Sequence, residues 1–282
     1  MRLARGRAAP VTAASEKYDA LVERLRSLGS VLVAYSGGVD STLLAYAARE
    51  ALGDRALNVL AVSEIQAPGE IEFARATAAS LSLPLVEIST DPLSDPAFTA
   101  NPADRCYACK RALLTFLREM ADDRGLAHVL EGSNLDDRSD VRPGHRAVIE
   151  LGASSPLDDV GLTKAEIREL SRELRLPTAE KPSMACLASR FPYGTEIDAA
   201  GLARVAAAEE ALAGLGLGQV RVRVHGDVAR LEVAPADLGR AFSAREQVSA
   251  AIKAAGFAYA SLDLDGYRTG SLNETLPEGA HD

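Results

Sequence analysis

Four hydroxyl or carboxylate side chains and two glycines stand together in the segment Ser36-Gly37-Gly38-Val39-Asp40-Ser41-Thr42. The glycine pair lets backbone N–H groups close on an anion, and the hydroxyls of Ser36, Ser41 and Thr42 add further donors. A helix that begins here would point the positive end of its dipole at the same anion. Asp40 would repel a bare phosphate, so it indicates either a Mg²⁺ ion or a structural hydrogen bond to the loop. The segment lacks the Gly-Lys-Ser/Thr ending of a Walker A loop, and a plain glycine-rich turn is the alternative.

The three cysteines form a second group that could do chemistry: Cys106 and Cys109 make a C-x-x-C pair, and Cys186 follows far downstream. A structural zinc site needs four protein ligands, and none of the four histidines stands at a finger-like spacing. Three thiolates do match a [4Fe–4S] cluster with one iron left open, and that iron could hold a sulfide. Cysteine is also a small buried hydrophobe. That alternative is stronger for the pair than for Cys186, whose surroundings are rich in proline and serine.

Basic side chains near these groups could bind a small anion. Arg221 and Arg223 alternate with valines, which predicts that both lie on one face of a half-buried strand. Guanidinium groups suit phosphate because they bind it with two hydrogen bonds, although a solvated strand face is the alternative. Arg190, four residues beyond Cys186, could steady an adenylate or phosphate or could form a structural salt bridge; Ser189 stands beside it.

The elements that must position these groups alternate between strands and helices. This alternation predicts an α/β fold with βαβ units and a parallel sheet, whose ligands lie beyond the carboxyl ends of the strands. Ser63, Asn134 and Asp137 follow such ends and are candidate contacts; Glu131 and Asp136 have less support. The expected strands are Val31–Tyr35, Leu57–Ser63, Leu85–Ile88 and His128–Gly132, and the expected helices are Ala14–Ser27, Thr42–Ala48, Glu70–Leu81 and Arg111–Asp122.

The pattern changes after a helix at Lys164–Leu174, which Thr163 and Glu166 would cap as a capping box. Lys181–Gly194 is predicted to be a functional loop. We expect a disordered tail over 1–13, an α/β domain over 14–195 and a small α+β domain for substrate binding or oligomerisation over 196–282. The small domain is expected to contain helices Ala199–Leu215 and Gln247–Ala255, a hairpin of Val220–His225 and Ala229–Val233, and a strand Tyr259–Leu264.

Composition narrows the classes of partner. The 282 residues are 47 % hydrophobic and carry a net charge of −9, which argues against a large nucleic-acid substrate and leaves room for a local basic pocket. No apolar run is long enough to span a bilayer, and the basic N-terminus lacks the apolar stretch of a signal peptide. These features predict a cytoplasmic protein with no membrane partner.

The segment Tyr35–Ser41 resembles the pyrophosphate loop of the N-type ATP pyrophosphatases, which include GMP synthetase, NAD synthetase and the tRNA-thiolating enzymes. This resemblance implies that the loop binds ATP through Ser36, Gly37, Gly38, Val39, Asp40, Ser41 and Thr42. It also implies that the protein makes an adenylated intermediate, which a nucleophile then attacks.

Three further segments, Asn101–Lys110, Glu131–Asp137 and Lys181–Gly194, resemble the LarE family of ATP-dependent sulfur transferases. Members of that family adenylate the carboxylates of pyridinium-3,5-biscarboxylic acid mononucleotide and convert them to thiocarboxylates in nickel-pincer nucleotide biosynthesis. The resemblance implies a Rossmann-like ATP pyrophosphatase domain and a homo-oligomer.

The resemblance also implies roles for single residues. Asp40 and Ser41 would serve catalysis and Ser63, Asn134, Asp137 and Arg190 would contact ATP. Ser189, Arg221 and Arg223 would bind the substrate, and Glu209 and Glu232 would bind a metal. Cys106, Cys109 and Cys186 resemble the family's cluster-bearing type, in which a [4Fe–4S] cluster carries the sulfide; in the other type, a cysteine at the position of Cys186 gives up its own sulfur.

Two other functions stay open at this point. One is another ATP-dependent enzyme of the same loop class, such as a tRNA-thiolating or amidating enzyme. The other is a non-enzymatic module that binds iron–sulfur or ATP, which would not need the arginines or Cys186.

Overall fold

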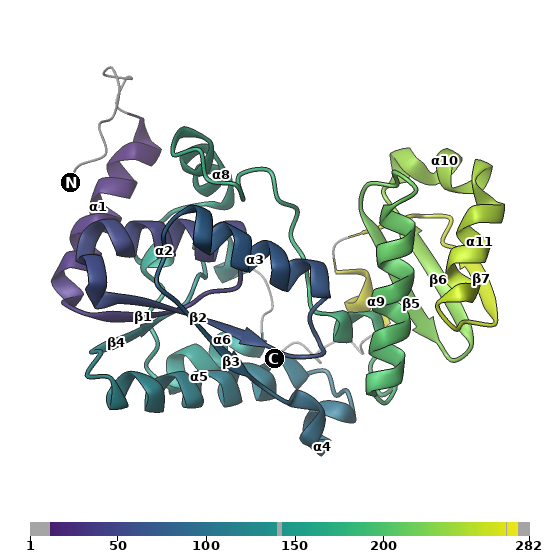
Figure 1. Cartoon of the computed structure of the whole chain (residues 1–282), viewed down its shortest axis with the longest axis horizontal. Coiled ribbons are helices and arrows are strands. Elements are labelled where there is room, and N and C mark those ends of the chain that lie inside the picture. The colour runs from purple at the N-terminus through teal and green to yellow at the C-terminus, as the bar shows by residue number, and fades with distance from the viewer. Residues whose placement is uncertain (1–11, 140–142, 269, 276–282) are drawn as a thin grey trace. The chain divides into compact units, whose positions relative to one another are not determined.

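The computed structural model describes residues 12–139, 143–268 and 270–275, and Figure 1 shows their arrangement into helices and strands. Residues 1–11 of the predicted tail lie outside this range. The helices are α1 Ala13–Leu28, α2 Val39–Leu52, α3 Pro68–Ser80, α4 Pro96–Thr99, α5 Arg105–Asp123, α6 Pro143–Glu150, α7 Pro156–Asp159, α8 Lys164–Glu173, α9 Ala199–Ala213, α10 Leu238–Ser243 and α11 Arg245–Ala254. The strands are β1 Val31–Ala34, β2 Ala56–Val62, β3 Leu85–Ser89, β4 His128–Leu130, β5 Val220–His225, β6 Val228–Val233 and β7 Tyr259–Leu262.

The chain divides into two compact units. The first, here the large-sheet unit, contains Ile71–Ile88, Lys110–Lys181 and the described residues before Val62. The second, here the small-sheet unit, contains Val62–Glu70, Ser89–Cys109 and the described residues from Pro182 on. Each unit therefore collects segments that lie far apart in the sequence.

The large-sheet unit is built on a four-stranded sheet in the order β3-β2-β1-β4, in which β1 pairs in parallel with both β2 and β4. Helices α2 and α3 lie on one side of this sheet and α5 on the other (Figure 1). The strand order reverses between β1 and β4, and this is the point at which α/β sheets open a crevice for ligands. The predicted α/β class with a parallel sheet is confirmed.

Buried apolar residues explain the sheet's position. The strand β1 is buried along Val31, Leu32 and Val33, as expected for a central parallel strand covered on both faces. Helix α1 buries the stripe that the sequence predicts, including Tyr18, Leu21, Val22 and Leu25. The predicted capping box of α8, formed by Thr163 and Glu166, is present.

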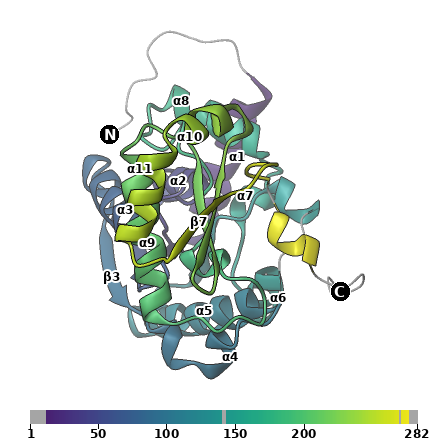
Figure 2. The same cartoon turned by 90° about the vertical axis from the view of Figure 1, so that its right-hand side faces the viewer.

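The small-sheet unit holds a three-stranded sheet in the order β5-β6-β7, with β5 and β6 antiparallel and β6 and β7 parallel. Helix α9 packs on β5, α11 packs on β7, and the two helices contact each other (Figure 2). Within the described residues, no helix combines the length and the apolar character needed to cross a membrane.

Two differences between the predicted elements and the structure affect the candidate sites. Helix α5 begins at Arg105 and not at Arg111, so both cysteines of the C-x-x-C pair lie in its first turns. No proline or glycine stands between Arg105 and Asp123, so nothing in the sequence delays the helix to Arg111. Strand β5 is buried on both faces from Val220 to Val224, so the expectation of a half-buried strand is wrong.

Candidate functional site

The glycine-rich loop connects β1 to α2 at the carboxyl end of β1. The Ser36 and Ser41 hydroxyl oxygens lie 3.0 Å apart, and the Ser36 N–H donates to the Ser41 hydroxyl at 3.2 Å. Gly38 is the N-cap of α2 and makes no side-chain hydrogen bond to the helix. The first backbone N–H groups of α2 therefore have no side-chain cap and can bind an anion.

Two glycines allow close approaches around this loop. Gly37 has φ of +69°, and a Cβ atom there would lie 2.5 Å from the Cβ of Ala74. A Cβ atom on Gly132, which follows β4, would lie 3.2 Å from the backbone nitrogen of Ser41. The loop keeps its shape because these positions have no side chain.

A cavity of about 250 Å³ opens beside the loop. The end of β1, the loop, the beginning of α2, helix α5 and the segment after β4 all contribute to its wall. The lining residues are Ala34, Ser36, Gly38, Asp40, Ser41, Lys110, Glu131, Gly132, Ser133 and Asp137. The cavity thus lies at the reversal of strand order, where a parallel sheet is expected to bind its ligand.

Asp40, which lines this cavity, has two side-chain partners. Its carboxylate accepts a hydrogen bond from the Asn134 side-chain amide at 3.2 Å and forms an ion pair with Lys164. The Lys164 backbone N–H also donates to Asp136 at 2.8 Å, which ties the first turn of α8 to the segment after β4. Asp40 and Asp137 line the same cavity, and carboxylate oxygens are the ligands that Mg²⁺ prefers. These residues fit a Mg²⁺ ion.

A buried carboxylate, Glu131, holds a lysine at the cavity wall. Its oxygens accept hydrogen bonds from Lys110 at 2.6 Å, from the Ser133 hydroxyl at 2.9 Å and from the Ser155 hydroxyl at 2.5 Å. Burial raises the pKa of Glu131, but the charge of Lys110 and these hydrogen bonds outweigh it and place the pKa below its usual value. Glu131 therefore stays ionised and fixes the ammonium group of Lys110 in the cavity.

Lys110 and Lys164 were missed by the sequence reasoning. Lys164 directly follows the N-cap Thr163, and Lys110 directly follows Cys109. The sequence offered one signal for them: each lysine directly follows a residue of a predicted feature, the helix cap Thr163 or the C-x-x-C pair.

Some predicted ATP contacts do not line the cavity. Thr42 is fully buried and Asn134 is 3 % exposed, so Asn134 reaches the site only through Asp40. Ser63 follows the end of β2, and its backbone N–H donates to the Gln66 side chain at 3.0 Å. Arg190 belongs to the small-sheet unit.

The three cysteines all belong to the small-sheet unit. Cys106 is exposed, and the partly buried Cys109 and Cys186 pack against the same apolar core. Burial and the charges of Cys186 and Cys106 raise the pKa of Cys109 to about 11, against the lowering effect of Arg105. The thiols are therefore near enough to influence one another.

Thiolates are the ligand type that an iron–sulfur cluster requires. Among the residues that the structure describes, however, no group of three or more His, Cys, Asp and Glu side chains is placed to hold a metal ion. The donor chemistry fits a cluster, while the thiols are not assembled into a coordinating group.

Asn101 joins the segment before the C-x-x-C pair to the loop that contains Cys186. It is fully buried with φ of +54°, and its side-chain amide donates to the Phe191 and Pro192 carbonyls at 3.3 and 2.8 Å. Its own carbonyl accepts from the Gly194 N–H at 2.9 Å. These bonds tie the segment before α5 to the end of the loop that contains Cys186.

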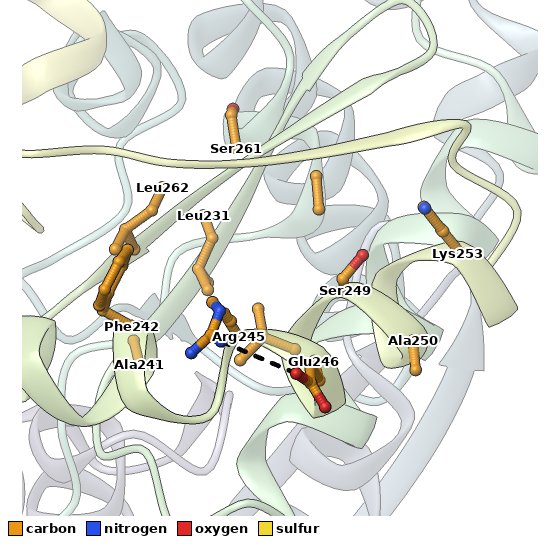
Figure 3. A pocket seen from close by; sticks show the side chains of 12 residues that line it. Leu231, Ala241, Phe242, Arg245, Glu246, Ser249, Ala250, Lys253, Ser261 and Leu262 are labelled. Carbon is orange, nitrogen blue, oxygen red and sulfur yellow. Dashed lines mark ion pairs between the residues drawn. The ribbon is translucent and has the colours of Figure 1, made fainter.

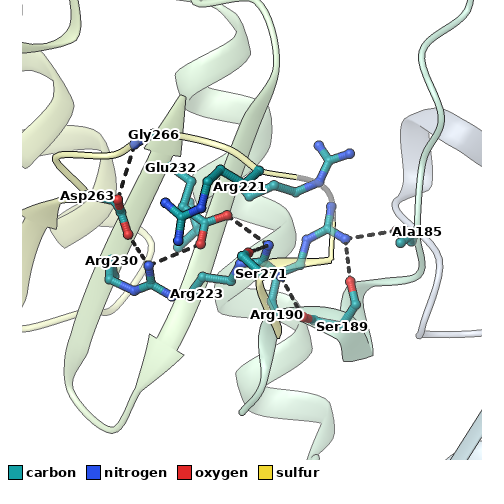
Figure 4. A network of polar contacts seen from close by, with 12 residues as sticks. Ala185, Ser189, Arg190, Arg221, Arg223, Arg230, Glu232, Asp263, Gly266 and Ser271 are labelled. Atoms are coloured by element: carbon teal, nitrogen blue, oxygen red, sulfur yellow. Dashed lines mark hydrogen bonds and ion pairs between the residues drawn. The ribbon is translucent and has the colours of Figure 1, made fainter. Parts of the chain in front are cut away.

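The predicted substrate arginines lie together with Ser189 and Arg190 (Figure 4). Arg223 donates to the Ser189 carbonyl at 2.7 Å and pairs with Glu232 at 2.8 Å. Arg221 is 4 % exposed and donates to the Val220 and Ser183 carbonyls at 2.7 and 3.2 Å. The prediction that they share a face agrees with this arrangement, and the solvated-face alternative is wrong.

Arg221 differs from Arg190 and Arg223, each of which pairs with a glutamate. Burial and the charge of Arg190 lower its pKa, and no carboxylate in the described part of the chain forms an ion pair with it. Its guanidinium also lies 5.3 Å from the centre of the Tyr267 ring. A buried arginine without a carboxylate is suited to an external anion.

Glu209 and Glu232, the predicted metal ligands, are both engaged by arginines. Both Glu209 oxygens accept from Arg190 at 2.9 Å, and Glu232 pairs with Arg223 and, at 3.1 Å, with Arg230. Their metal role stays a prediction, without a supporting contact.

A second groove of about 650 Å³ lies along α10, α11 and β7 (Figure 3). Its wall is mainly apolar, and its Arg245 and Glu246 face each other at 3.7 Å. None of the predicted site residues lines it.

Comparison with known proteins agrees with the geometry of the loop. The profile described as NAD synthase matches residues 14–106. A pyridinium-3,5-bisthiocarboxylic acid mononucleotide synthase of Lactiplantibacillus plantarum is 38 % identical over 92 % of this chain and 95 % of its own length. An uncharacterised protein of Synechocystis is 40 % identical over 92 % of this chain and 98 % of its own length. A component of the glutamine-hydrolysing GMP synthase of Methanosphaerula palustris is 29 % identical over 55 % of this chain and 54 % of its own length.

Proposed function

The chain belongs to the LarE family of ATP-dependent sulfur transferases, and from that premise we propose that it makes thiocarboxylates on a pyridinium mononucleotide. In this proposal a carboxylate of pyridinium-3,5-biscarboxylic acid mononucleotide attacks the α-phosphorus of ATP, and pyrophosphate leaves. A sulfur nucleophile then attacks the acyl-adenylate, AMP leaves, and the carboxylate has become a thiocarboxylate.

The cavity beside the loop is the observation that carries the first step. Uncapped N–H groups of α2 and the hydroxyls of Ser36 and Ser41 can donate to phosphate oxygens. Lys110, held by Glu131, adds a positive charge at the cavity wall. Asp40 and Asp137 would hold Mg²⁺, which when bound neutralises phosphate charge.

The small-sheet unit supports an anionic substrate. Arg221 is the buried guanidinium without a carboxylate partner in the described chain, so we assign it to the substrate's phosphate. Arg223 is already paired with Glu232 and supports this site by holding the Ser189 carbonyl. The acidic net charge disfavours tRNA as the substrate.

For the sulfur source we propose a [4Fe–4S] cluster held by Cys106, Cys109 and Cys186. All three cysteines belong to one unit, which supports it. The cluster would keep sulfur anionic and nucleophilic near Cys186.

The test is anaerobic reconstitution of the full chain with iron and sulfide, followed by reaction with the biscarboxylate nucleotide, ATP and Mg²⁺. We expect AMP, pyrophosphate and thiocarboxylate to form only with the nucleotide, with more than one turnover per chain. AMP formation that depends on tRNA would contradict the substrate assignment. Absence of bound iron, together with conversion of Cys186 to dehydroalanine, would contradict the cluster and leave the adenylation assignment standing.

Asp40→Ala and Ser41→Ala test the loop itself. Both variants should lose substrate-dependent pyrophosphate release, because each removes a group from the phosphate cavity. Arg118→Gln, which changes an exposed arginine on α5, is the matched control. Normal pyrophosphate release by both loop variants would show that the loop does not bind ATP.

A further inference from the structure

A lysine binds the backbone of the glycine-rich loop without lining the cavity beside it. The Lys181 ammonium group donates a hydrogen bond to the Gly37 carbonyl at 3.0 Å and lies 4.1 Å from the centre of the Phe73 ring. The cavity wall includes Lys110 but not Lys181. The charge of Lys181 therefore acts on the loop itself, whereas that of Lys110 faces the cavity.

The position of Lys181 is fixed by its own segment. Arg168, on α8, donates hydrogen bonds to the Ala179 and Lys181 carbonyls at 2.6 and 2.7 Å. These residues, Gly37 and Phe73 all belong to the large-sheet unit. The ammonium group thus reaches the loop from a backbone that is held in place.

The bond from Lys181 orients one peptide group of the loop. The Gly37 carbonyl belongs to the peptide that joins Gly37 to Gly38, and this peptide is trans, so its C=O and N–H point in opposite directions. Lys181 holds the C=O, while the Gly38 N–H is directed at the Ser36 hydroxyl, 3.4 Å away. Ser36 and Gly38 both line the cavity. Lys181 therefore keeps the Gly38 N–H on the cavity side of the loop.

The Gly38 N–H is a donor that a ligand can take over. Its distance of 3.4 Å to the Ser36 hydroxyl is long, since such bonds usually measure about 2.9–3.0 Å. A cation at the C=O end also polarises the peptide and strengthens the N–H as a donor, as successive hydrogen bonds in a chain do. The peptide is bounded on another side by α3, because a Cβ atom on Gly37 would lie 2.5 Å from the Ala74 Cβ.

We propose that Lys181 is a positioning residue for ATP cleavage: it orients and polarises the Gly37–Gly38 peptide so that the Gly38 N–H binds the departing pyrophosphate. This inference rests on the proposed function, in which the substrate carboxylate displaces pyrophosphate from the α-phosphorus. The electron pair of the broken P–O bond stays on pyrophosphate, whose charge grows as the bond breaks. A fixed donor aimed at that charge stabilises the transition state more than it stabilises bound ATP.

The sequence allows this single peptide to be observed directly. Gly37–Gly38 is the one place in the 282 residues where two glycines are adjacent. Full-length protein made with glycine that carries ¹³C at its carbonyl carbon and ¹⁵N at its nitrogen therefore gives one carbonyl-to-amide NMR correlation, which reports the Gly37 C=O and the Gly38 N–H.

That correlation tests both ends of the peptide. In the wild type, inorganic pyrophosphate with Mg²⁺ should move the Gly38 amide proton downfield, because the N–H gains a stronger acceptor. In Lys181→Met the Gly37 carbonyl carbon should move upfield, because its hydrogen bond is lost, and the response of Gly38 to pyrophosphate should disappear. Lys181→Arg keeps the cation and should keep the response. An equal response in the wild type and Lys181→Met would overturn the proposal.

Kinetics give the size of the effect on the reaction. Lys181→Met should lower kcat for pyrophosphate release by about ten- to a hundredfold, somewhat less than outright removal of a donor to a developing anion. The KM of the biscarboxylate nucleotide should not change. Phe73→Leu, which removes the ring but keeps an apolar side chain, should lower kcat by about two- to fivefold. Lys253→Met, at an exposed position on α11, is the matched control and should change neither the spectrum nor kcat.

A purely structural role of Lys181 predicts a different result. The folded fraction of Lys181→Met would then be smaller, but Gly38 in that fraction would respond to pyrophosphate as in the wild type, and the proposal would be wrong. If Lys181→Met does not fold, the wild type decides, because a Gly38 signal that ignores pyrophosphate also overturns the proposal.

Failure of the proposed function would be recognised separately. The Gly38 response needs neither the biscarboxylate nucleotide nor a sulfur source. A wild type whose Gly38 responds to pyrophosphate, yet which releases none with the nucleotide, would contradict the proposed function and leave the orientation of the peptide by Lys181 standing.

Discussion

The two units place charge in different ways. Around the loop cavity, Asp40 and Glu131 are paired with Lys164 and Lys110, and both lysines keep about a third of their side chains exposed, at 32 % and 31 %. In the small-sheet unit, two arginines are paired with carboxylates almost out of contact with water: Arg223 with Glu232, at 8 % and 1 % exposure, and Arg190 with Glu209, at 1 % and 11 %.

The partly exposed lysine pairs and the buried arginine pairs suit different functions. A partly exposed lysine is a compact point charge, so it can also meet a phosphate while its carboxylate partner holds it in place. A buried arginine–carboxylate pair has fixed geometry and is expensive to break. The lysine pairs therefore suit a site that binds and releases a nucleotide, whereas the arginine pairs suit a frame that holds other groups still.

The largest expected effect, on the free energy of unfolding, comes from removing a carboxylate that pairs with a buried arginine. Glu232→Gln removes the charge that Arg223 and Arg230 share; the buried Arg223 then lacks its carboxylate, while the partly exposed Arg230 keeps Asp263. We expect a loss of about 3–5 kcal/mol in the free energy of unfolding, measured by urea denaturation. Glu87→Gln, which breaks an exposed pair with Arg75, should cost about 0–1 kcal/mol. Equal losses in the two variants would show that burial does not separate these pairs.

Gly37→Ala tests whether the loop cavity also depends on a rigid element. The new Cβ would lie 2.5 Å from Ala74 on a backbone with φ of +69°. We expect a cost of about 2–4 kcal/mol from strain and overpacking, together with loss of ATP binding. Gly53→Ala, at φ of +59° with open space around it, should cost about 1–2 kcal/mol and leave ATP binding intact. A variant that binds ATP normally would contradict the role of the close approach.

Lys164→Gln tests whether the Asp40–Lys164 pair contributes to nucleotide binding. Without Lys164, the carboxylate of Asp40 faces the phosphate cavity with only Asn134 as its partner. We expect the affinity for a non-hydrolysable ATP analogue with Mg²⁺ to fall by about ten- to a hundredfold in calorimetric titration. Lys17→Gln is the control: Lys17 pairs with Glu166, which lies on α8 as Lys164 does, and this substitution should leave the affinity unchanged. If Lys164→Gln binds the analogue as the wild type does, the Asp40–Lys164 pair is structural and does not serve nucleotide binding.

The smallest effect concerns the pH dependence of Glu131. Its pKa is lowered in the folded state, so its contribution to stability is present above the unfolded-state pKa of about 4.3 and is lost as pH falls through the folded-state pKa. The wild type should therefore exceed Glu131→Gln by about 1 kcal/mol between pH 5 and 8, with the gap closing in stronger acid. A gap that persists at about pH 2 would show that the charge of Glu131 is not its source.

The parts of the site that the sequence predicted are those whose atoms are close along the chain. The loop segment Ser36–Thr42 spans seven residues that follow β1 and run into the first turn of α2, so its type and position follow from local pattern alone. The alternation of Arg221 and Arg223 likewise predicted their common face. Their burial was not predictable, because the contacts of Arg221 with Ser183 and of Arg223 with Ser189 come from a loop more distant in the sequence.

The sequence could not identify three basic residues with specific partners, Lys110, Lys164 and Arg105, for the same physical reason. A long basic side chain is usually solvated, and what distinguishes these three is the partner that they reach: Glu131, Asp40 and Asn101. Lys110 and Lys164 have partners 21 and 124 residues away. Arg105 lies near its partner, yet its missing carboxylate becomes visible only when the surrounding structure is known.

Because Asn101 binds Phe191, Pro192 and Gly194, the two units are completed at different times during synthesis. The segments of the large-sheet unit are complete once Lys181 has been made, so its loop and cavity can form while translation continues. Cys106 and Cys109 must wait for Phe191, Pro192 and Gly194, and at about 5–20 residues per second that wait lasts on the order of 5–20 seconds. During this interval two thiols of the nascent chain stand without the loop that carries the third. A chain truncated before Phe191 would therefore hold the formed loop cavity, while its C-x-x-C pair would lack the loop that Asn101 binds.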